Sequence, residues 1–232
     1  MALDLPQHLR AVLPPATEIA WMALVGNLPA GAYLVGGTGI AAHLGHRVSR
    51  DFDFFVGEQF DPQVLALRLE RLGRFIPTRL EPGTLNGYLD ETRIQFLDAA
   101  DQYPVEPMVE IGGMPVAGLG DLLATKLKVI GDRGELRDYF DLLVLEAAGH
   151  RVEEGLAIFV ERYRPATPEA AVIHIVRGLG YLADVADDPA LPMSRQEIED
   201  YWTGRQPTVV RSLEWLTGRQ GRRQSPGPEL SR

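Results

Sequence analysis

Hydrophobic and polar positions in the first half of the chain alternate between helical and extended spacing. Residues 3–28 carry apolar side chains at helical intervals with a break at Pro14–Pro15, and residues 62–75 repeat that spacing. Short apolar or alternating runs predict strands at 32–35, 51–56, 75–80, 84–89, 92–97 and 109–116. A helix predicted at 38–44 follows the first strand directly. This half of the chain therefore predicts a mixed sheet with helices packed on it.

The second half of the chain shows helical spacing throughout. Predicted helices cover 119–130, 136–148, 152–163, 168–185, 194–203 and 208–216. The fold class is therefore α/β in the broad sense (α+β), with a mixed α/β domain over residues 1–116 and a helical bundle over 117–217. Residues 218–232 are rich in Gly, Arg, Gln, Ser and Pro, which predicts a disordered tail.

Composition narrows the classes of protein that fit. The 232 residues include no cysteine, which excludes disulfides, zinc–thiolate sites and thiol nucleophiles and favours a cytoplasmic protein. No apolar stretch reaches the roughly 20 residues of a membrane span, and the first ten residues do not resemble a secretory signal. The net charge of −9 argues against a surface built wholly for nucleic acid, although a local basic patch stays compatible with it.

Two short motifs carry the candidate chemistry. Gly36, Gly37 and Thr38 follow a predicted strand and open a helix, where backbone N–H groups and a hydroxyl can hold phosphate. Asp51 and Asp53 alternate along the next strand, so both carboxylates share one face and can hold a hard cation. Phosphate and Mg²⁺, with Mn²⁺ as the alternative ion, together indicate a nucleotide. Taken alone, the glycines could form a tight turn and the aspartates a solvated strand face.

These residues resemble those of a known family. The run Leu34-Val-Gly-Gly-Thr, followed by Gly45-His-Arg-Val-Ser-Arg-Asp-Phe-Asp, resembles the signature of nucleotidyltransferases related to DNA polymerase beta. More narrowly, it is similar to the AbiEii/AbiGii toxin branch, in which an arginine and a Ser or Thr precede the aspartates. That branch also has a later lysine and an Arg-Asp-x-x-Asp-Leu motif, which resemble Lys126 and the run from Arg137 to Leu142.

The resemblance implies a role for each matching residue. The implied catalytic residues are Asp51, Asp53, Lys126 and Asp141, of which Asp51 and Asp53 hold the metal. The implied nucleotide-binding residues are Gly36, Gly37, Thr38, Arg47, Ser49, Lys126, Arg133 and Asp138. The implied reaction moves a nucleoside monophosphate from a nucleoside triphosphate to an acceptor hydroxyl, with the tRNA 3′ end as one acceptor. A toxin of this kind also implies an antitoxin partner.

The later lysine and the Arg-Asp-x-x-Asp-Leu motif also have alternative explanations in the sequence itself. Lys126 lies on the apolar face of its helix, so it either reaches a triphosphate or packs its stem while the ammonium reaches solvent. Asp138 and Asp141 either turn toward the cleft, or form a helix-start pair or a salt bridge with Arg133 or Arg137.

One position departs from the family pattern. Many relatives carry a third carboxylate on a later strand, where this chain has Gln95. An amide adds no negative charge and cannot act as a general base. Asp98 has the opposite parity to Gln95, so it could substitute only if the strand ends or bulges there. Asp138 or Asp141 of the helical module is the other candidate substitute. The chain is thus either a nucleotidyltransferase or a catalytically weakened nucleotide-binding module acting through a protein partner, with an aminoglycoside-type transferase as a third alternative.

Overall fold

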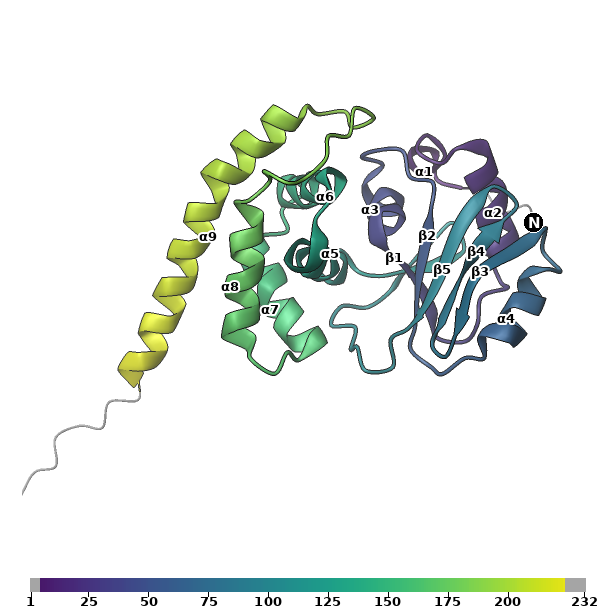
Figure 1. Ribbon diagram of the computed structural model, residues 1–232, viewed down its shortest axis with the longest axis horizontal. Coiled ribbons are helices and arrows are strands. Elements are labelled where there is room, and N and C mark those ends of the chain that lie inside the picture. The colour runs from purple at the N-terminus through teal and green to yellow at the C-terminus, as the bar shows by residue number, and fades with distance from the viewer. Residues whose placement is uncertain (1–4, 224–232) are drawn as a thin grey trace, which may run out of the picture.

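A single mixed sheet organises the first half of the molecule (Figure 1). The computed structural model describes residues 5–223, with side chains described through residue 213. The strands are β1 (Ala32–Val35), β2 (Phe52–Val56), β3 (Phe75–Glu81), β4 (Thr84–Leu89), β5 (Thr92–Asp98), β6 (Val109–Ile111) and β7 (Met114–Val116). Their order across the sheet is β3-β4-β5-β2-β1-β7-β6. Strand β2 pairs antiparallel with β1 and parallel with β5, so the strand that carries the acidic pair lies near the centre.

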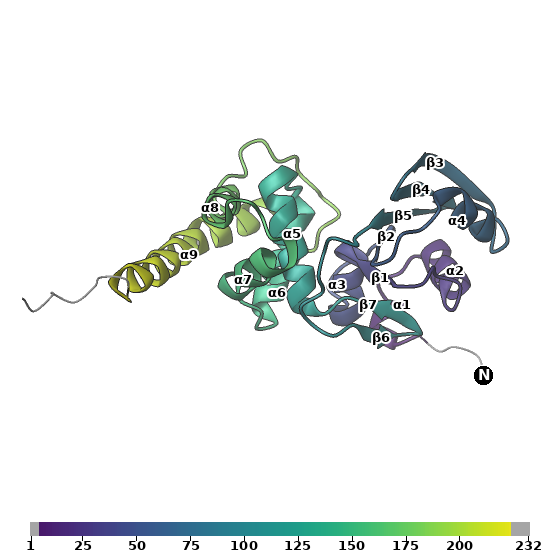
Figure 2. The ribbon, with the colours of Figure 1, turned by 90° about the horizontal axis from the view of Figure 1, so that it is seen from below.

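Helices pack on both faces of this sheet (Figure 2). The helices of the first half are α1 (Gln7–Arg10), α2 (Pro15–Leu24), α3 (Gly36–Leu44) and α4 (Pro62–Leu69). Helices α2 and α4 lie on one face, whereas α3 and the helices of the second half lie on the other. The predicted mixed sheet with flanking helices is confirmed.

The alternation along β2 assigns its residues to the two faces. Phe52 and Phe54 are fully buried against the α2 and α4 side, together with Trp21. Asp51 and Asp53 are only partly buried and have the opposite parity, and the charge of Lys126 in α5 acts on Asp53. Because successive strand side chains point to opposite faces, the buried phenylalanines fix the direction of both carboxylates.

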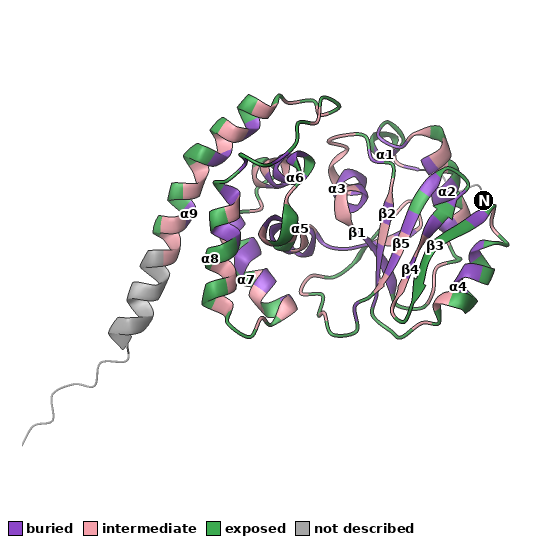
Figure 3. Ribbon diagram, in the orientation of Figure 1, coloured by how far each residue is buried: buried purple, intermediate pink, exposed green. Residues whose placement is uncertain are grey.

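The second half is helical, as predicted. Its helices are α5 (Leu119–Arg133), α6 (Leu136–Ala147), α7 (Val152–Tyr163), α8 (Pro168–Leu179) and α9 (Arg195–Arg223). Their buried faces turn toward one another around α5, which Figure 3 shows as purple segments inside the bundle. Tyr33 and Val35 of β1 belong to the same hydrophobic cluster, so the bundle packs directly on the sheet.

A buried arginine also links the two modules. Arg162 of α7 donates from Nη1 to Asp121 of α5 at 2.7 Å and from Nη2 to the Tyr33 hydroxyl of β1 at 2.7 Å. The Arg162 side chain is fully buried, and its guanidinium lies over the rings of Tyr33 and Phe55. A buried charge held this closely fixes α5, and with it Lys126, relative to the sheet.

The C-terminal helix differs from its prediction. The two helices expected at 194–203 and 208–216 form one helix, α9, with Pro207 inside it. Proline removes one helical hydrogen bond, but Ile198, Trp202 and Val209 are all fully buried on one side of α9 and hold both halves against the bundle. The helix also continues through residues 218–223 of the predicted tail, because adding residues to a formed helix costs little. The remaining residues of that tail, 224–232, lie outside the described residues.

Helix α8 also ends earlier than predicted. It ends at Leu179, with Gly180 as its C-cap residue, although apolar side chains continue to Val185. Leu182 and Val185 are buried but do not lie in a helix, so the apolar spacing of this segment reflects its burial and does not indicate a helix. In residues 5–223 no helix is both long enough and apolar enough to cross a membrane.

Candidate active site

The bend after β1 requires glycine because of its backbone and its neighbour. Gly36 has φ +69°, a conformation that side chains with a Cβ rarely adopt. A Cβ added to Gly36 would lie 2.5 Å from Asp53 Oδ2. The helix α3 starts at Gly36 itself, two residues earlier than predicted, with Val35 as its N-cap residue and no side-chain cap. The diglycine bend and the β2 carboxylate are therefore in direct proximity, and the uncapped helix start lies beside them.

The sheet register places Gln95 directly beside Asp53. Residues Asp53 of β2 and Gln95 of β5 are partners in the parallel ladder, and Val35 of β1 is the partner of Asp53 on the other side. The predicted third-acid position is thus an amide next to the acidic pair. Asp98 pairs with Val56 at the far end of β5 and lines a separate hollow with Asp61, so it does not replace the missing acid.

Asp51 and Asp53 have no protein partner for their carboxylates. Among residues 5–213, no hydrogen bond or ion pair involves the side-chain oxygens of either residue. Burial raises the pKa of Asp53, the charge of Lys126 lowers it, and the charge of Asp51 raises it again, with a net increase. Two neighbouring carboxylates without compensation fit a bound cation, which would favour their ionised forms.

The donor set suits a hard cation that also binds substrate. No group of three or more His, Cys, Asp or Glu residues in the described part of the chain could hold a metal ion by itself. Asp51 and Asp53 supply two carboxylates, and Gln95 supplies an amide oxygen nearby. Mg²⁺ is commonly held by one or two carboxylates with waters and substrate phosphates completing its shell. The residues therefore fit Mg²⁺ in the presence of a nucleotide.

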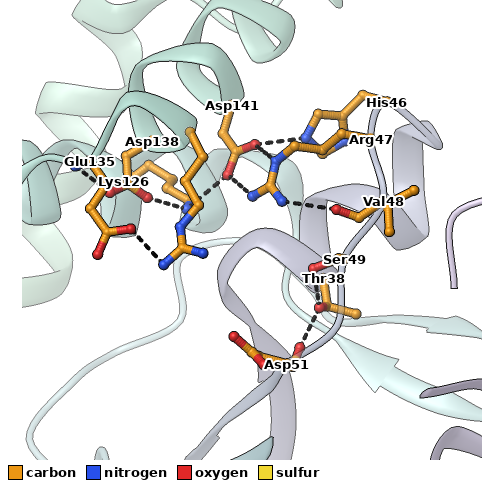
Figure 4. Close-up of polar contacts among 11 residues, drawn as sticks. Thr38, His46, Arg47, Val48, Ser49, Asp51, Lys126, Glu135, Asp138 and Asp141 are labelled. Atoms are coloured by element: carbon orange, nitrogen blue, oxygen red, sulfur yellow. Dashed lines mark hydrogen bonds and ion pairs between the residues drawn. The ribbon is translucent and has the colours of Figure 1, made fainter. Parts of the chain in front are cut away.

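A second charged cluster surrounds Asp141, which is fully buried in α6 (Figure 4). Arg47 donates from Nε at 2.6 Å and from Nη2 at 2.8 Å to the two oxygens of Asp141. Lys126 Nζ lies 2.8 Å from Asp141 Oδ2, and His46 Nε2 lies 2.8 Å from Oδ1. Asp141 therefore joins the loop before β2 to helix α5, holding two of the predicted triphosphate-binding cations.

The pKa shifts within this cluster follow from its closed pairing. Burial alone would raise the pKa of Asp141, but Lys126, His46 and Arg47 together hold it well below its usual range. Burial would lower the pKa of Lys126 and of Arg47, but the charges and hydrogen bonds of the facing aspartates raise both. All three groups are therefore charged throughout the neutral range.

Asp138 has a structural contact on each oxygen. Lys126 Nζ donates to its Oδ1 at 2.6 Å, and the backbone N–H of Glu135 donates to its Oδ2 at 2.9 Å. Glu135 and Asp138 form a reciprocal capping box at the start of α6. The helix-start explanation therefore holds for Asp138, and the ion-pair explanation holds for both aspartates. Lys126 pairs with both and Arg47 pairs with Asp141, in place of the expected Arg133 or Arg137.

Thr38 and Ser49 are buried and contact each other. Their hydroxyl oxygens are 2.6 Å apart, and Thr38 also donates to the backbone carbonyl of Asp51. Both side chains are almost fully buried, Thr38 at 2% exposure and Ser49 at 7%. They hold the start of α3 against the entry to β2, so their direct effect is to position the two motifs relative to each other.

Arg133 is exposed and lines a different hollow, of about 840 Å³, together with His174 and Arg177 of the helical module. The hollow beside Asp51 does not include it. The structure thus brings together the diglycine bend, the acidic pair and the Lys126 cluster, whereas Arg133 opens onto a second surface.

Sequence reasoning assigned no role to two residues of this region, His46 and Arg93. His46 contacts Asp141 and stacks on Phe140 with ring centroids 5.9 Å apart. Arg93 and Arg137 carry charges that lower the pKa of Asp53, so both lie near it. The position of Arg93 two residues before Gln95 could have revealed it, because alternate strand residues share a face.

This mixed sheet, with an acidic pair beside a glycine bend and an uncapped helix start, has the fold of a nucleotidyltransferase. A putative nucleotidyltransferase from H. pylori has a similar solved structure, with a TM-score of 0.55 and 19% identity over 87% of this chain and 97% of that one. The nucleotidyltransferase toxin MenT4 from Mycobacterium tuberculosis is similar at a TM-score of 0.36 and 16% identity over 81% of this chain and 93% of that one.

Sequence comparison gives the family. Residues 24–211 match the family described as "Nucleotidyl transferase AbiEii toxin, Type IV TA system". The chain belongs to the AbiEii nucleotidyltransferase toxin family, as its motifs predicted. It is also similar to an uncharacterized protein of Aquifex aeolicus, at 28% identity over 73% of this chain and 80% of that protein.

Proposed function

We propose that the protein is a Mg²⁺-dependent nucleotidyltransferase that moves a nucleoside monophosphate from a triphosphate to an acceptor hydroxyl. The observation that carries this proposal is the unpaired acidic pair, Asp51 and Asp53, beside the Gly36 bend. Membership of the AbiEii family supports nucleotidyl transfer as the reaction class.

The triphosphate would bind at the start of α3. The backbone N–H groups of Gly37 and Thr38 lie in the first turn of an uncapped helix, where an anion is favoured. Lys126 and Arg47 would provide positive charge at the same place, with Asp141 keeping both in position. Because the groups of this cluster stay charged through the neutral range, the site would not need to gain or lose a proton to receive the triphosphate.

The reaction balances without an additional reactant. The acceptor oxygen forms a bond to the α-phosphorus while the bond from that phosphorus to the bridging oxygen breaks, and pyrophosphate leaves. The hydroxyl proton passes to solvent. Asp51 and Asp53 would hold the Mg²⁺, which supplies charge stabilisation for the phosphates when bound. The protein's own contribution is to align the reactants and present fixed charge.

The biological acceptor and partners follow as further parts of this proposal. We propose the 3′ end of tRNA as the acceptor and the cytoplasm as the place of action, with an antitoxin as the regulatory partner. The description of the family as the toxin of a type IV toxin–antitoxin system supports the toxin role.

The proposal is tested by incubating the purified protein with labelled nucleoside triphosphates, total tRNA and Mg²⁺. We expect label in the tRNA with the wild type and none with Asp53→Ala. Asp98→Asn is the matched control, because Asp98 is an exposed acid on the neighbouring strand β5 that lines another hollow. Absence of labelling with the wild type across all four nucleotides and total tRNA would contradict the proposed reaction.

A second candidate function is nucleotide binding without transfer, acting through a protein partner. Gln95 beside Asp53 favours it, because the third carboxylate is missing. Isothermal calorimetry with a nonhydrolysable triphosphate separates the two candidates when combined with the labelling assay. Binding accompanied by labelling supports the enzyme, whereas binding that persists without labelling supports the module.

A further inference from the structure

A hollow of about 450 Å³ lies beside Asp51, on the side away from the diglycine bend. Its walls come from the start of α2, from the entry to β2, and from the β4–β5 hairpin. Asp51, Arg50, Arg93 and Tyr88 all line it. Sheet order places it relative to the triphosphate site, because β1 with the diglycine bend is on one side of β2 and β5 with Arg93 is on the other.

The hollow contains cations without partners. Arg50 and Arg93 are both exposed, and within residues 5–213 neither guanidinium makes a hydrogen bond or ion pair. Two further arginines near the acidic pair have partners, Arg47 with Asp141 and Arg137 with Glu135. Free guanidinium groups in a hollow next to a reaction centre are suited to a phosphate group of the substrate.

An aromatic side chain and a helix start complete the lining. Tyr88 is 43% exposed and occupies the position on β4 that pairs with Arg93 on β5. Its ring is therefore available for stacking beside the free guanidinium. Ala16 and Thr17 line the opposite wall in the first turn of α2, a ten-residue helix with no side-chain cap, so their N–H groups add to the positive character.

Two acids also line the hollow. Asp51 would be neutralised by the cation that it is proposed to hold, which leaves Glu91 in the β4–β5 turn. With that cation bound, the two arginines exceed the remaining acid by one charge. The hollow then favours an anionic occupant over the cationic drug of an aminoglycoside-type transferase.

In-line transfer requires the acceptor and the leaving pyrophosphate on opposite sides of the α-phosphorus. With the triphosphate at the start of α3, the acceptor must approach from the β5 side of β2. We propose that this hollow binds the 3′-terminal segment of a single-stranded nucleic acid acceptor, with Arg50 and Arg93 on its phosphates and the Tyr88 ring stacked on a base. This inference rests on the proposed function and adds the acceptor-binding residues to it.

The test measures acceptor binding separately from transfer. A 5′-fluorescein RNA octamer with a 3′ hydroxyl is titrated by anisotropy against the full-length protein with Mg²⁺ and a mixture of the four α,β-methylene triphosphates. We expect Arg93→Gln to weaken RNA binding by about tenfold or more, the effect of losing one charge-assisted hydrogen bond. The slope of log affinity against log salt should decrease by about one. Triphosphate affinity, measured without RNA, should stay within about twofold.

Matched variants separate these roles from general effects of charge and folding. Arg50→Gln should behave as Arg93→Gln does. Tyr88→Ala should weaken RNA binding by about tenfold and Tyr88→Phe should not, since the phenyl ring still stacks. Arg71→Gln should change nothing, because Arg71 is an exposed arginine just after α4 that does not line the hollow. Thermal melting of each variant reports whether it is folded.

Three results would overturn the inference: no RNA binding by the wild type, equal RNA binding by the wild type and folded Arg50 and Arg93 variants, or a parallel loss of triphosphate binding. The last result would assign the hollow to the triphosphate. RNA binding that depends on Arg50 and Arg93, in a protein that labels no acceptor, would contradict the proposed reaction while the acceptor site stands.

Discussion

The two charged regions of the site differ in one respect, which is whether the protein itself pairs their charges. Around Asp141, every oxygen of the carboxylate contacts a cation, and the residue is fully buried. Asp51 and Asp53, at the start of β2, have no such partner among the side chains that the structure describes. We call the Asp141 group the closed cluster, because protein cations pair its carboxylate completely and it thereby holds other residues in place. We call Asp51 and Asp53 the open region, because carboxylates without such a partner are suited to a partner from outside the chain.

The largest expected effect comes from opening the closed cluster. Asp141→Asn removes the charge that faces Arg47 and Lys126, and leaves two nearly buried cations without full compensation. We expect a loss of about 3–5 kcal/mol in the free energy of unfolding, measured by urea denaturation. Asp200→Asn, at an exposed acid of α9, is the control and should change stability by less than about 0.5 kcal/mol. Equal stability of the two variants would show that the Asp141 cluster does not hold the modules together.

The next effect concerns the contact between the bend and the acidic pair. Gly36→Ala places a methyl group against Asp53 and strains a positive-φ position, so Mg²⁺-dependent triphosphate binding should be lost. Gly26→Ala has the same backbone strain at φ +74° with nothing within 4 Å of the added atom. Both variants should lose about 1 kcal/mol of stability from backbone strain, but only Gly36→Ala should lose binding by calorimetry. Equal binding by both would separate the bend from the site.

A smaller effect on stability has the opposite sign. Burial raises the pKa of Asp53, so its ionised form is less favourable in the folded protein than in the unfolded chain. Asp53→Asn should therefore raise the melting temperature in the absence of divalent cations while abolishing transfer. The gain should be absent below the ordinary carboxyl pKa of 3.8, should grow as pH rises toward the raised value, and should then stay constant. Calorimetric melting at a series of pH values checks this, and a lower melting temperature at neutral pH would contradict the unpaired state of Asp53.

How much of this could be read from the sequence differs between the two regions. The alternation of Asp51, Phe52, Asp53 and Phe54 predicts both the strand and its faces, because the buried phenylalanines allow one orientation. The family resemblance implies that Gln95 occupies the position of the third acid, and the register places it beside Asp53. Such local patterns suffice where neighbouring residues determine the outcome.

The closed cluster could not be derived in the same way. His46 and Arg47 meet Asp141 more than 90 residues along the chain, and only the packing of α6 on the sheet brings them together. The single helix through Pro207 is similar, because contacts of Trp202 and Val209 with the bundle override a local helix breaker. In both cases tertiary packing decides between explanations that the sequence leaves equal.

The smallest expected effect concerns the third carboxylate that the open region lacks. Gln95→Glu adds a third carboxylate to the open region, beside Asp53. We expect tighter Mg²⁺ binding, by about tenfold or less, and faster transfer, together with a lower melting temperature in the absence of Mg²⁺. Gln63→Glu, at an exposed glutamine in the first turn of α4, is the control. Slower transfer by Gln95→Glu would mean that the amide itself serves the reaction.

The most direct measurement is a crystal structure of the protein soaked with Mg²⁺ and a nonhydrolysable nucleoside triphosphate. The account predicts a cation held by the carboxylates of residues 51 and 53, with the phosphates against the N–H groups that open α3. A triphosphate bound elsewhere, or in this position with no cation on either aspartate, would contradict it.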